Sequence, residues 1–375
     1  MSTITLYIMN DTTRAGLLLN AANIPCEIFL KLCNDYQPSE ILTGPSFWRE
    51  LGLSEEQISR LSSLLAKDGW AERELEQVDK LNAKFITAKD IDYPAKLFDI
   101  IRPPVGLYVQ GKVNLSLPSV SIVGTRKCSS YGQLTASGLA RALAQNNIIT
   151  ISGGARGIDS HAHRGALSAD GITIAVFGTS IDKIYPTENR DLFSRILERG
   201  AIISEYPLNS GGDKWHFPER NKIIAGLASR VVVIEAGEKS GALITAGFAR
   251  KIGRELWAVP GRINEEISKG TNKLIHDGAK CLYDINAFIE TFMGKSLQLD
   301  LFADEKENVK ATNSTPELSD DEKVIYSLLQ RQGGRLIDEL IAESKLDASS
   351  VQFSLMTLEA EGLIIEKSGR YSASV

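Results

Sequence analysis

Four short β-branched runs of this sequence each end in a turn that carries glycine together with polar or basic residues. They occupy residues 121–126, 149–159, 174–179 and 231–237. Such a turn exposes the first backbone N–H groups of the following helix, which lack intrahelical acceptors and lie at the positive end of the helix dipole. Glycine lets a phosphate group approach this main chain closely. The turns therefore predict phosphate sites, although tight turns between strands and helices also need glycine for purely steric reasons.

Hydroxyl groups and cations accompany the glycines and define a predicted binding surface. The residues expected to contact phosphate groups are Gly124, Thr125, Arg126, Ser152, Gly153, Gly154, Ser240 and Gly241. The expected cations are Lys127, Arg156, Lys214, Arg220 and Lys222. Gly157, Asn221 and Thr245 belong to the same segments and complete the surface. Asp159 is itself anionic, so we expect it to cap or brace its turn rather than to contact a phosphate.

Cations and aromatic rings alternate between residues 211 and 222, where Trp215 and Phe217 follow Lys214. Rings stack on unpaired bases while cations follow the backbone of a nucleic-acid strand, and this pairing tolerates any sequence because every base has a π face. We expect Tyr131 or Phe217 to stack on a base. The alternative is that Trp215 and Phe217 pack into the core while the neighbouring cations are only solvated.

The motifs of common enzyme classes do not match the spacing in this chain. Residues 124–129 lack the second and third glycines of a dinucleotide-binding turn, and residues 237–240 lack the Gly-Lys pair of a phosphate-binding loop. His161 and His163 lie two residues apart, so a helix turns them to different faces and packing or capping is their expected role. No Gly-x-Ser-x-Gly nucleophile motif is present. We find no catalytic constellation in the sequence and expect no metal or cofactor.

One enzyme class stays open as an alternative. Rossmann-type phosphoribohydrolases, which remove bases from nucleotide monophosphates, carry a Pro-Gly-Gly-x-Gly-Thr loop near the corresponding strand end. Residues 235–241 read Glu-Ala-Gly-Glu-Lys-Ser-Gly at that place and lack the loop. A nucleotide-processing enzyme is therefore the less favoured reading, and incubation with nucleotides followed by a search for free base tests it.

Apolar strands alternate with helical stretches between residues 119 and 279, which indicates a parallel sheet whose ligands bind beyond the carboxyl ends of the strands. We therefore predict an α/β fold with an extended Rossmann-like core and nucleic-acid-binding domain over residues 119–290. Residues 1–80 show short helical patterns and predict a small all-helical, SAM-like domain, in which Ser54 is a candidate N-cap. Residues 81–118 predict an extended connector because their prolines resist regular helix.

The end of the chain predicts a linker over residues 291–316 and a winged-helix-like domain over residues 317–375. Three helical patterns precede two short strands around a Ser-Gly turn. The expected recognition helix, residues 348–361, has no Lys or Arg that meets phosphates, so contact with protein is favoured over contact with duplex DNA. A pure interaction scaffold, in which this acidic tail binds a partner and DNA is incidental, remains a further alternative.

Charge is distributed unevenly along the 375 residues, a length that suggests two or three domains. Residues 1–100 carry 10 Lys and Arg against 15 Asp and Glu, residues 101–290 carry 23 against 17, and residues 291–375 carry 9 against 15. A polyanion is attracted to the middle segment and repelled by the flanks. The chance variation of charge between domains is the simpler alternative.

The remaining composition indicates a soluble globular protein, with 43% hydrophobic and 24% charged residues. No apolar stretch approaches the roughly 18 to 20 residues that cross a bilayer, and the N-terminus shows no secretion signal. The four cysteines have no metal-ligand spacing, which is typical of reduced thiols in a cytoplasm. We expect a cytoplasmic protein without a membrane partner.

The order of motifs along the middle segment resembles the bacterial DNA-processing protein A (DprA/Smf) family. The matching motifs are residues 123–126, 131–132, 152–159, 162–163, 185–186, 204–205, 217–221, 240–246, 260–261 and 278–279. The resemblance implies a non-enzymatic binder of single-stranded DNA with a helical domain, an extended Rossmann body and a winged-helix-like tail. It also implies a homodimer through the Rossmann body that protects incoming DNA and loads a RecA-type recombinase during natural transformation.

The chain departs from the family pattern at three places. The family usually has Ser-Gly-Leu-Ala where residues 152–155 read Ser-Gly-Gly-Ala, and Arg-Asn-Arg where residues 220–222 read Arg-Asn-Lys. The second exchange keeps a cation but loses a planar fork of donors. The helical domain has Ala-Ala-Asn-Ile-Pro at residues 21–25 in place of a Gly-x-Gly hairpin, so we do not expect it to bind DNA.

Overall fold

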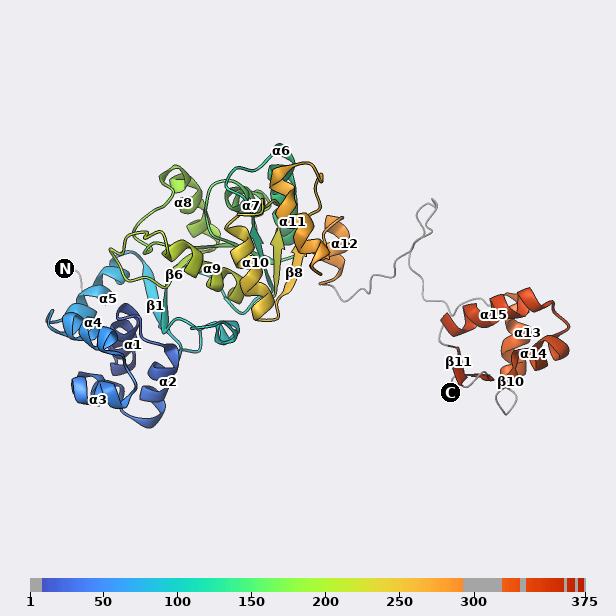
Figure 1. The fold of residues 1–375 in the computed structure, drawn as a ribbon, viewed down its shortest axis with the longest axis horizontal. Helices are drawn as coiled ribbons and strands as arrows, with labels where there is room; N and C mark the ends of the chain where they lie inside the picture. Colours follow the sequence, from blue (N-terminus) through green and yellow to red (C-terminus); the bar gives the residue numbers. More distant parts are fainter. Residues whose placement is uncertain (1–8, 293–318, 331–334, 361–362, 368–369, 374–375) are drawn as a thin grey trace, which may run out of the picture. The chain divides into compact units, whose positions relative to one another are not determined.

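The computed structural model describes residues 9–292, 319–330, 335–360, 363–367 and 370–373 (Figure 1). The chain divides into two compact units, residues 1–298 and 299–375, and each is described by itself. The N-terminal unit contains a helical domain and a large sheet. The predicted linker, apart from its first two residues, lies outside the described residues.

Short helices form the beginning of the N-terminal unit, as predicted. They are α1 (Asp11–Ala21), α2 (Cys26–Asp35), η1 (Pro38–Leu42), α3 (Pro45–Glu50), α4 (Glu55–Leu65) and α5 (Trp70–Lys80), of which η1 is a 3₁₀ helix. Ser54 caps α4 because its Oγ accepts a hydrogen bond from the backbone N–H of Gln57 at 3.3 Å, while Gln57 Oε1 accepts one from the Ser54 N–H at 2.9 Å. Ile58 and Leu61 of α4 are buried. The N-cap expectation for Ser54 is confirmed.

A nine-stranded sheet forms the centre of the same unit and has the order β1-β2-β6-β5-β4-β3-β7-β8-β9. The strands are β1 (Ala83–Thr87), β2 (Gly106–Gly111), β3 (Ser119–Val123), β4 (Ile149–Ser152), β5 (Thr173–Val176), β6 (Ala201–Ser204), β7 (Arg230–Val233), β8 (Glu255–Ala258) and β9 (Lys280–Cys281). All neighbours from β6 to β9 pair in parallel, whereas β1–β2 and β2–β6 pair antiparallel. The predicted Rossmann-like core is confirmed.

The strand order reverses direction at β3. The chain runs from β3 through β4 and β5 to β6 on one side and then returns to place β7 on the other side of β3. In open parallel sheets, such a reversal opens a crevice beyond the carboxyl ends of the two central strands, because the connections leave in opposite directions. The turns after β3 and β7 are therefore the two that border a crevice.

Helices cover both faces of this sheet (Figure 1). They are α6 (Ser130–Gln145), α7 (Ile158–Leu167), α8 (Arg190–Arg199), α9 (His216–Leu227), α10 (Ala242–Lys251), α11 (Glu266–His276) and α12 (Ile285–Glu290), with the 3₁₀ helices η2 (Ala95–Asp99) and η3 (Thr187–Asn189). Alternate residues of a strand face opposite sides. Val120 and Ile122 of β3 accordingly pack in one buried layer with Leu139 of α6, and Val123 packs in a second layer that includes Ile223 of α9.

The segment predicted as an extended connector adds β1 and β2 to the antiparallel edge of the sheet. Between them, Arg102 adopts a left-handed backbone conformation with a φ of 56°. The residue before a proline normally prefers an extended conformation, and a non-glycine residue at positive φ is disfavoured by its Cβ. Arg102, which precedes Pro103, therefore departs from the extended conformation that the sequence predicts for it.

A buried carboxylate joins the helical domain to the sheet. Glu74 of α5 accepts hydrogen bonds at Oε1 from the Tyr108 hydroxyl at 3.0 Å and from the Leu208 N–H at 2.7 Å. Burial raises the pKa of Glu74, although these two donors act in the opposite direction. Because its partners come from β2 and from the segment after β6, Glu74 fixes α5 against the sheet.

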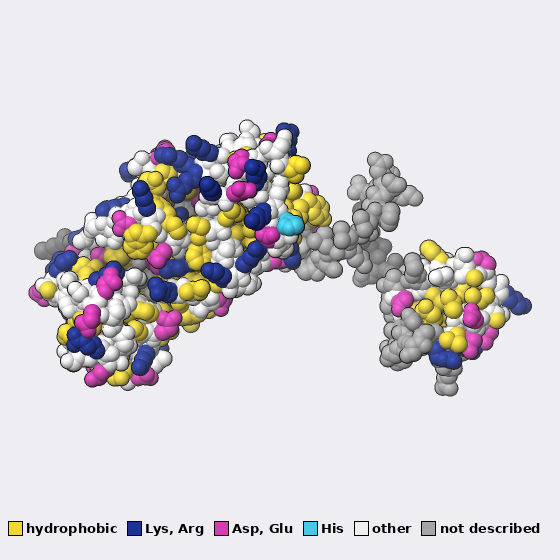
Figure 2. Space-filling view, viewed as in Figure 1, with side chains coloured by type: hydrophobic (Ala, Val, Ile, Leu, Met, Phe, Trp, Pro, Cys, Tyr) yellow, Lys and Arg dark blue, Asp and Glu magenta, His cyan; other side chains and the backbone are white. Residues whose placement is uncertain are grey.

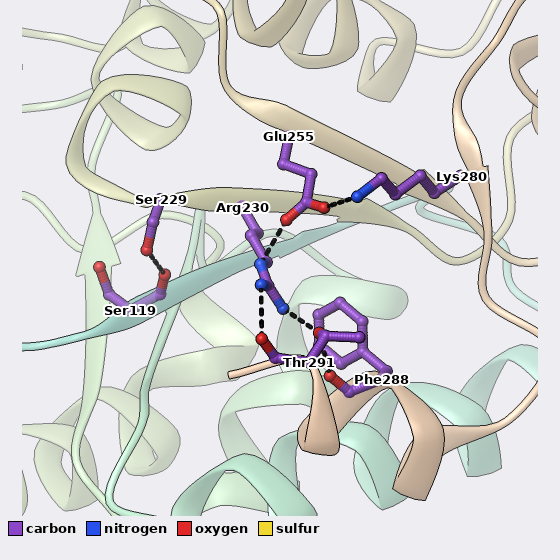
Figure 3. A network of polar contacts seen from close by, with 7 residues as sticks. All are labelled: Ser119, Ser229, Arg230, Glu255, Lys280, Phe288 and Thr291. Atoms are coloured by element: carbon purple, nitrogen blue, oxygen red, sulfur yellow. Dashed lines mark hydrogen bonds and ion pairs between the residues drawn. The ribbon is translucent and has the colours of Figure 1, made fainter. Parts of the chain in front are cut away.

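A polar network holds the amino ends of β7, β8 and β9 (Figure 3). Arg230 pairs with Glu255, which also pairs with Lys280. The Arg230 guanidinium donates to the Thr291 carbonyl at 3.2 Å, and its Cζ lies 3.7 Å from the centroid of the Phe292 ring. Glu255 thus compensates the cations at the amino ends of these strands. The glycine turns lie at the opposite, carboxyl ends.

The C-terminal unit has the predicted winged-helix arrangement. Its elements are α13 (Asp320–Leu329), β10 (Arg335–Leu336), α14 (Ile337–Ser344), α15 (Ala348–Ala360), β11 (Ile364–Lys367) and β12 (Arg370–Ala373). The three strands form an antiparallel sheet in the order β10-β12-β11. Ile325, Leu340 and Val351 form a small core between the helices. Phe353 of α15 is exposed, and hydrophobic and acidic side chains share the viewed face of this unit (Figure 2).

Within the described ranges, no helix has the length and the apolar character that crossing a bilayer requires.

Candidate nucleic-acid interface

A cavity of about 930 Å³ lies where the sheet order reverses. Its main walls come from the turn after β3, the turn before α7, the beginning of α9 and the segment from residue 237 to α10. Tyr185, Glu266 and Ile267 also line it. We call it the switch-point cavity. Four segments that are distant in sequence thus converge at the carboxyl ends of β3 and β7, where the topology predicts a ligand.

The turn after β3 presents two exposed cations to this cavity. Thr125 donates its N–H to the Glu235 carbonyl at 2.8 Å, and its Oγ1 accepts a hydrogen bond from the Lys127 N–H at 3.2 Å. These bonds fix the main chain, whereas the side chains of Arg126 and Lys127 are solvent-exposed. Arg126 and Lys127 both line the cavity and form no ion pair within residues 9–292. Their charges are therefore available to a phosphate.

In the turn after β4, a side chain of the protein itself accepts the hydrogen bonds of the backbone N–H groups. Asp159, in the first turn of α7, accepts hydrogen bonds at Oδ2 from the N–H groups of Gly153 and Ala155 at 3.2 and 3.3 Å. A Cβ at Gly153 would approach the Arg220 Nη2 to 2.7 Å and the Asp159 Oδ2 to 2.8 Å, so glycine is needed there for steric reasons. Asp159 braces the turn, as predicted from the sequence.

Two buried side chains of opposite charge, Arg220 and Asp159, line the floor of the cavity. Arg220 of α9 is only 5% exposed and donates from Nη1 to the carbonyls of Gly153, at 2.8 Å, and of Val176. Burial lowers the pKa of Arg220 to about 10, while Asp159 acts against this shift. Burial also raises the pKa of Asp159, and the positive charge of Arg220 limits the increase. Arg220 mainly holds three backbone segments together and compensates Asp159.

Aromatic rings accompany the exposed cations at the cavity mouth. The Arg126 guanidinium carbon lies 5.9 Å from the centroid of Phe217, within the range of a cation–π contact. Phe217 packs against Tyr185, with 5.2 Å between the ring centroids, and Tyr185 is 49% exposed. Lys214 also lines the cavity and is exposed. Cations and rings are thus brought together on one wall.

The fourth wall is built around the beginning of α10. Ser240 Oγ accepts a hydrogen bond from the Ala242 N–H at 3.3 Å, and Asn221 of α9 donates to the Gly241 carbonyl at 3.4 Å. Lys239 precedes these residues, is exposed and lines the cavity. It forms no ion pair with any described residue of the N-terminal unit. Lys239 therefore adds a further available charge to the same cavity.

The beginning of α6, which is the phosphate seat of dinucleotide-binding proteins, is occupied by the protein itself. Glu235 follows β7, is 3% exposed, and accepts hydrogen bonds from the Ser129 N–H at 2.9 Å and from the Ser129 hydroxyl. A Cβ at Gly132 would collide with this carboxylate. The carboxylate takes the donors that an anionic cofactor would need and repels a second negative charge. The geometry therefore disfavours a dinucleotide at this helix end.

The switch-point cavity brings together most of the surface predicted from the sequence. The predicted residues that line it are Gly124, Thr125, Arg126, Lys127, Lys214, Phe217, Arg220, Asn221, Ser240, Gly241 and Thr245. Of these, Arg220 and Thr245 are buried. The cavity thus has a floor of buried polar groups and a rim with four exposed cations, Arg126, Lys127, Lys214 and Lys239. The rim also carries two exposed carboxylates, Glu238 and Glu266, of which Glu266 pairs with Lys269.

Seven predicted residues lie elsewhere: Tyr131, Ser152, Gly153, Gly154, Arg156, Gly157 and Lys222. Tyr131 is 53% exposed and lines a neighbouring cavity together with Pro260 and Arg262. Ser152 is buried and donates its hydroxyl to the Ile122 carbonyl at 2.7 Å. Arg156 pairs with Glu188, and Lys222 pairs with Glu205 at 3.1 Å. These partners give Ser152, Arg156 and Lys222 structural contacts that sequence reasoning did not anticipate.

Sequence reasoning missed Lys239 and Tyr185 as cavity residues. Lys239 immediately precedes the predicted Ser240, so its position in the same turn was a usable signal. Tyr185 lies between β5 and α8, beyond the glycine turn of residues 174–179. Only the folded chain brings it to Phe217.

His163 of α7 provides a test of the fold around the site. Its Nδ1 lies 2.7 Å from the Thr173 hydroxyl, and burial lowers its pKa to about 3. The unfolded chain takes up a proton near pH 6.5 while the native protein does not, so stability falls as pH decreases from about 6.5 toward 3. From pH 7 to pH 5, we expect His163 to contribute a loss of about 2 kcal/mol to the free energy of unfolding.

Urea unfolding at the two pH values measures this effect. His163→Asn should have a smaller pH dependence than the unmodified protein, whereas His276→Asn, at an exposed position, should leave it unchanged. Equal slopes for the unmodified protein and His163→Asn contradict a buried neutral imidazole. The packing role expected for His163 is confirmed by its burial.

The sequence and the structure are similar to proteins of one family. Residues 84–293 match the family model of DNA recombination-mediator protein A, and residues 309–370 match the DprA winged helix domain. Protein Smf of Synechocystis sp. is 34% identical over 324 residues, which cover 79% of this chain and 81% of that protein.

Solved structures of DNA processing protein A are also similar. The X-ray structure of the Streptococcus pneumoniae protein has a TM-score of 0.63 and 30% identity, and the match covers 75% of this chain and 98% of that one. The Helicobacter pylori protein, whose structure concerns its single-stranded DNA binding mode, has a TM-score of 0.52 and 34% identity, with 56% of this chain and 96% of that one covered.

Proposed function

Because the chain belongs to the DNA recombination-mediator protein A family, we propose that it binds single-stranded DNA irrespective of sequence in DNA processing and transformation. We further propose that it protects the incoming strand and delivers it to a RecA-type recombinase. A homodimer through the Rossmann-like domain and a cytoplasmic location belong to the same proposal. The winged-helix unit then serves contact with protein, since α15 carries no Lys or Arg.

The observation that supports DNA binding most directly is the rim of the switch-point cavity. Arg126, Lys127, Lys214 and Lys239 are exposed, whereas the buried charges of Arg220 and Asp159 compensate each other. Lys and Arg side chains also gather around a hollowed part of the surface near α7 and α8 (Figure 2). An extended polyanion satisfies four separated cations better than a single phosphate does, and the rings at the mouth suit unpaired bases.

The test is a gel shift of the full chain with a mixed-sequence strand and with the duplex of the same sequence, each at two salt concentrations. We expect tighter binding of the single strand. Four phosphate contacts predict a slope of about −3 in a plot of log affinity against log salt concentration. Tighter binding of the duplex, or an affinity for the strand that is independent of salt, contradicts the proposal.

We propose binding rather than catalysis as the activity of this site. The carboxylate of Glu235 already accepts hydrogen bonds from Ser129, and Asp159 is engaged by two N–H groups and faces Arg220. Neither buried carboxylate is available as an acid or base. Of the two exposed carboxylates that line the cavity, Glu266 pairs with Lys269 at 2.6 Å, and Glu238 lies in the turn before α10. Incubation of the protein with nucleotide monophosphates should release no free base, and release above a buffer control contradicts this part of the proposal.

A further inference from the structure

A second cavity, of about 430 Å³, lies where the helical domain meets the sheet. We call it the junction cavity. The first turn of α9 separates it from the switch-point cavity. Lys214, Phe217, Pro218 and Asn221 line the switch-point cavity, and Trp215, His216, Glu219 and Lys222 line the junction cavity. This division follows the helical period, which places residues three and four positions apart on the same face.

Trp215 is the outermost member of a column of three rings beside the junction cavity. His216 stacks on Tyr206 with 3.9 Å between the ring centroids, and Trp215 meets His216 edge-on at 4.1 Å. Trp215 is 51% exposed, while Tyr206 and His216 are buried. Packing therefore holds an exposed indole in place, which reduces the entropy that a stacking ligand must overcome.

Arg102 supplies a cation that is available at the same cavity. It lines the cavity, is exposed and forms no ion pair within residues 9–292. The other two basic residues of the lining, Arg60 and Lys222, pair with Glu56 and Glu205 at 2.6 and 3.1 Å. The positive φ of Arg102 before a proline costs conformational energy, and such strain is retained where the surrounding structure overdetermines it, which is common at ligand sites.

Amide groups form the inner wall of the junction cavity. Asn20 donates to the Glu205 carbonyl at 2.8 Å and accepts from the Gly106 N–H at 3.3 Å, so its side chain is fixed between the helical domain and the sheet. Gln57 donates to the Asn23 carbonyl at 3.3 Å. Three Arg or Lys residues and three Glu residues balance the formal charge of the lining. The lining therefore has no net charge that attracts a polyanion from a distance. A ligand must be selected by stacking on Trp215 and by the local charge of Arg102.

We propose that the junction cavity seats an unpaired base of a DNA strand that leaves the switch-point cavity over the first turn of α9. Trp215 is the stacking platform, and Arg102 contacts the adjoining phosphate. The proposal rests on the function proposed above and extends the path of the strand to the helical domain. Lys214 lines the switch-point cavity, and its neighbour Trp215 lines the junction cavity. A DNA strand whose phosphate contacts Lys214 therefore reaches Trp215, the next residue of the protein, with one of its bases.

A length series of oligothymidylates with the full chain tests this path. Trp215→Ala should weaken binding of strands long enough to cross α9 by roughly fivefold to a hundredfold, the range found for loss of one base–aromatic stack. It should leave the affinity for the shortest strand that binds unchanged, because that strand occupies the switch-point cavity alone. Trp215→Tyr should restore most of the loss. Ile91→Ala, at a fully exposed position that lines neither cavity, is the control.

Intrinsic fluorescence gives a second readout. Trp48 and Trp257 are buried and Trp70 is half-buried, so a stacked base should quench mainly Trp215. Long strands should quench the emission of the unmodified protein more than short ones, and Trp215→Phe should remove that difference.

Arg102→Gly separates the proposed contact from folding. Glycine accepts the left-handed conformation without strain, so the unfolding midpoint should not fall, while affinity for long strands should fall severalfold. If the unmodified protein binds DNA but Trp215→Ala and Arg102→Gly bind every length equally well, the junction site is wrong and the proposed function stands. If the unmodified protein binds no strand of any length, the proposed function itself fails.

Discussion

Arg126→Ala/Lys239→Ala should lose most of the affinity for single-stranded DNA. The two cations lie on different segments of the switch-point cavity, after β3 and before α10. Each charge-assisted hydrogen bond contributes roughly 1.5–3 kcal/mol, so removal of both should weaken binding by at least about a hundredfold. The slope of log affinity against log salt concentration should become less negative by about 1.4, since a single strand releases about 0.7 counterion per contact.

The matched control is Arg141→Ala/Lys251→Ala, which removes the same charge from exposed positions in α6 and α10 that do not line the cavity. It should retain nearly full affinity and the original slope. Fluorescence anisotropy of a labelled strand at four salt concentrations measures both quantities. Equal losses in the two double variants would mean that net charge, rather than the cavity, attracts DNA.

Arg220→Met should destabilise the N-terminal unit by about 3–5 kcal/mol, because it leaves Asp159 buried without a counter-charge. It also removes the donors that hold the Gly153 and Val176 carbonyls. All four tryptophans lie within residues 1–298, so tryptophan fluorescence during urea unfolding reports this unit. Adding Asp159→Asn to Arg220→Met should recover part of the loss, since the double variant buries no unpaired charge.

The pH dependence of Arg220→Met provides a second check. Without Arg220, the pKa of Asp159 rises further above its usual range. A carboxyl group whose pKa is raised in the native state stabilises at low pH, and this contribution is lost as pH increases through the native pKa. Arg220→Met should therefore lose more stability at pH 8 than at pH 5. A pH-independent loss would indicate that the hydrogen bonds, and not the buried charge, determine the role of Arg220.

The positions of the cavity residues next to β3 and α10 were predictable, because the residue types and the parallel topology both indicate the same end of the sheet. A glycine turn after a buried strand places Arg126 and Lys127 at the strand end, and parallel pairing brings such ends to one edge. Ser240 and Gly241 follow the same rule. The sequence also predicted helices at the beginning, a parallel sheet in the middle and a winged-helix-like end, because proline content and helical periodicity change along the chain.

The inward position of Arg220 was not predicted, although the helical period contained a signal. Arg220 precedes Ile223, Ile224 and Leu227 by three, four and seven residues, which places it on the apolar stripe of α9. Lys222 lies off that stripe and pairs with Glu205 from the segment after β6. Such pairings depend on which strands become neighbours, and residue types alone do not specify them. The same reason explains why Tyr185 was missed.

The carboxylate of Glu235 at the start of α6 has a practical consequence for chemical inhibition. Compounds that imitate NAD or ATP rely on a free helix end for their phosphates, and here a built-in anion already fills it. Screening collections aimed at cofactor sites are thus poorly matched to this protein. An effective inhibitor should carry two or more spaced anionic groups that bridge Arg126 and Lys239, with an aromatic group directed at Phe217 and Tyr185.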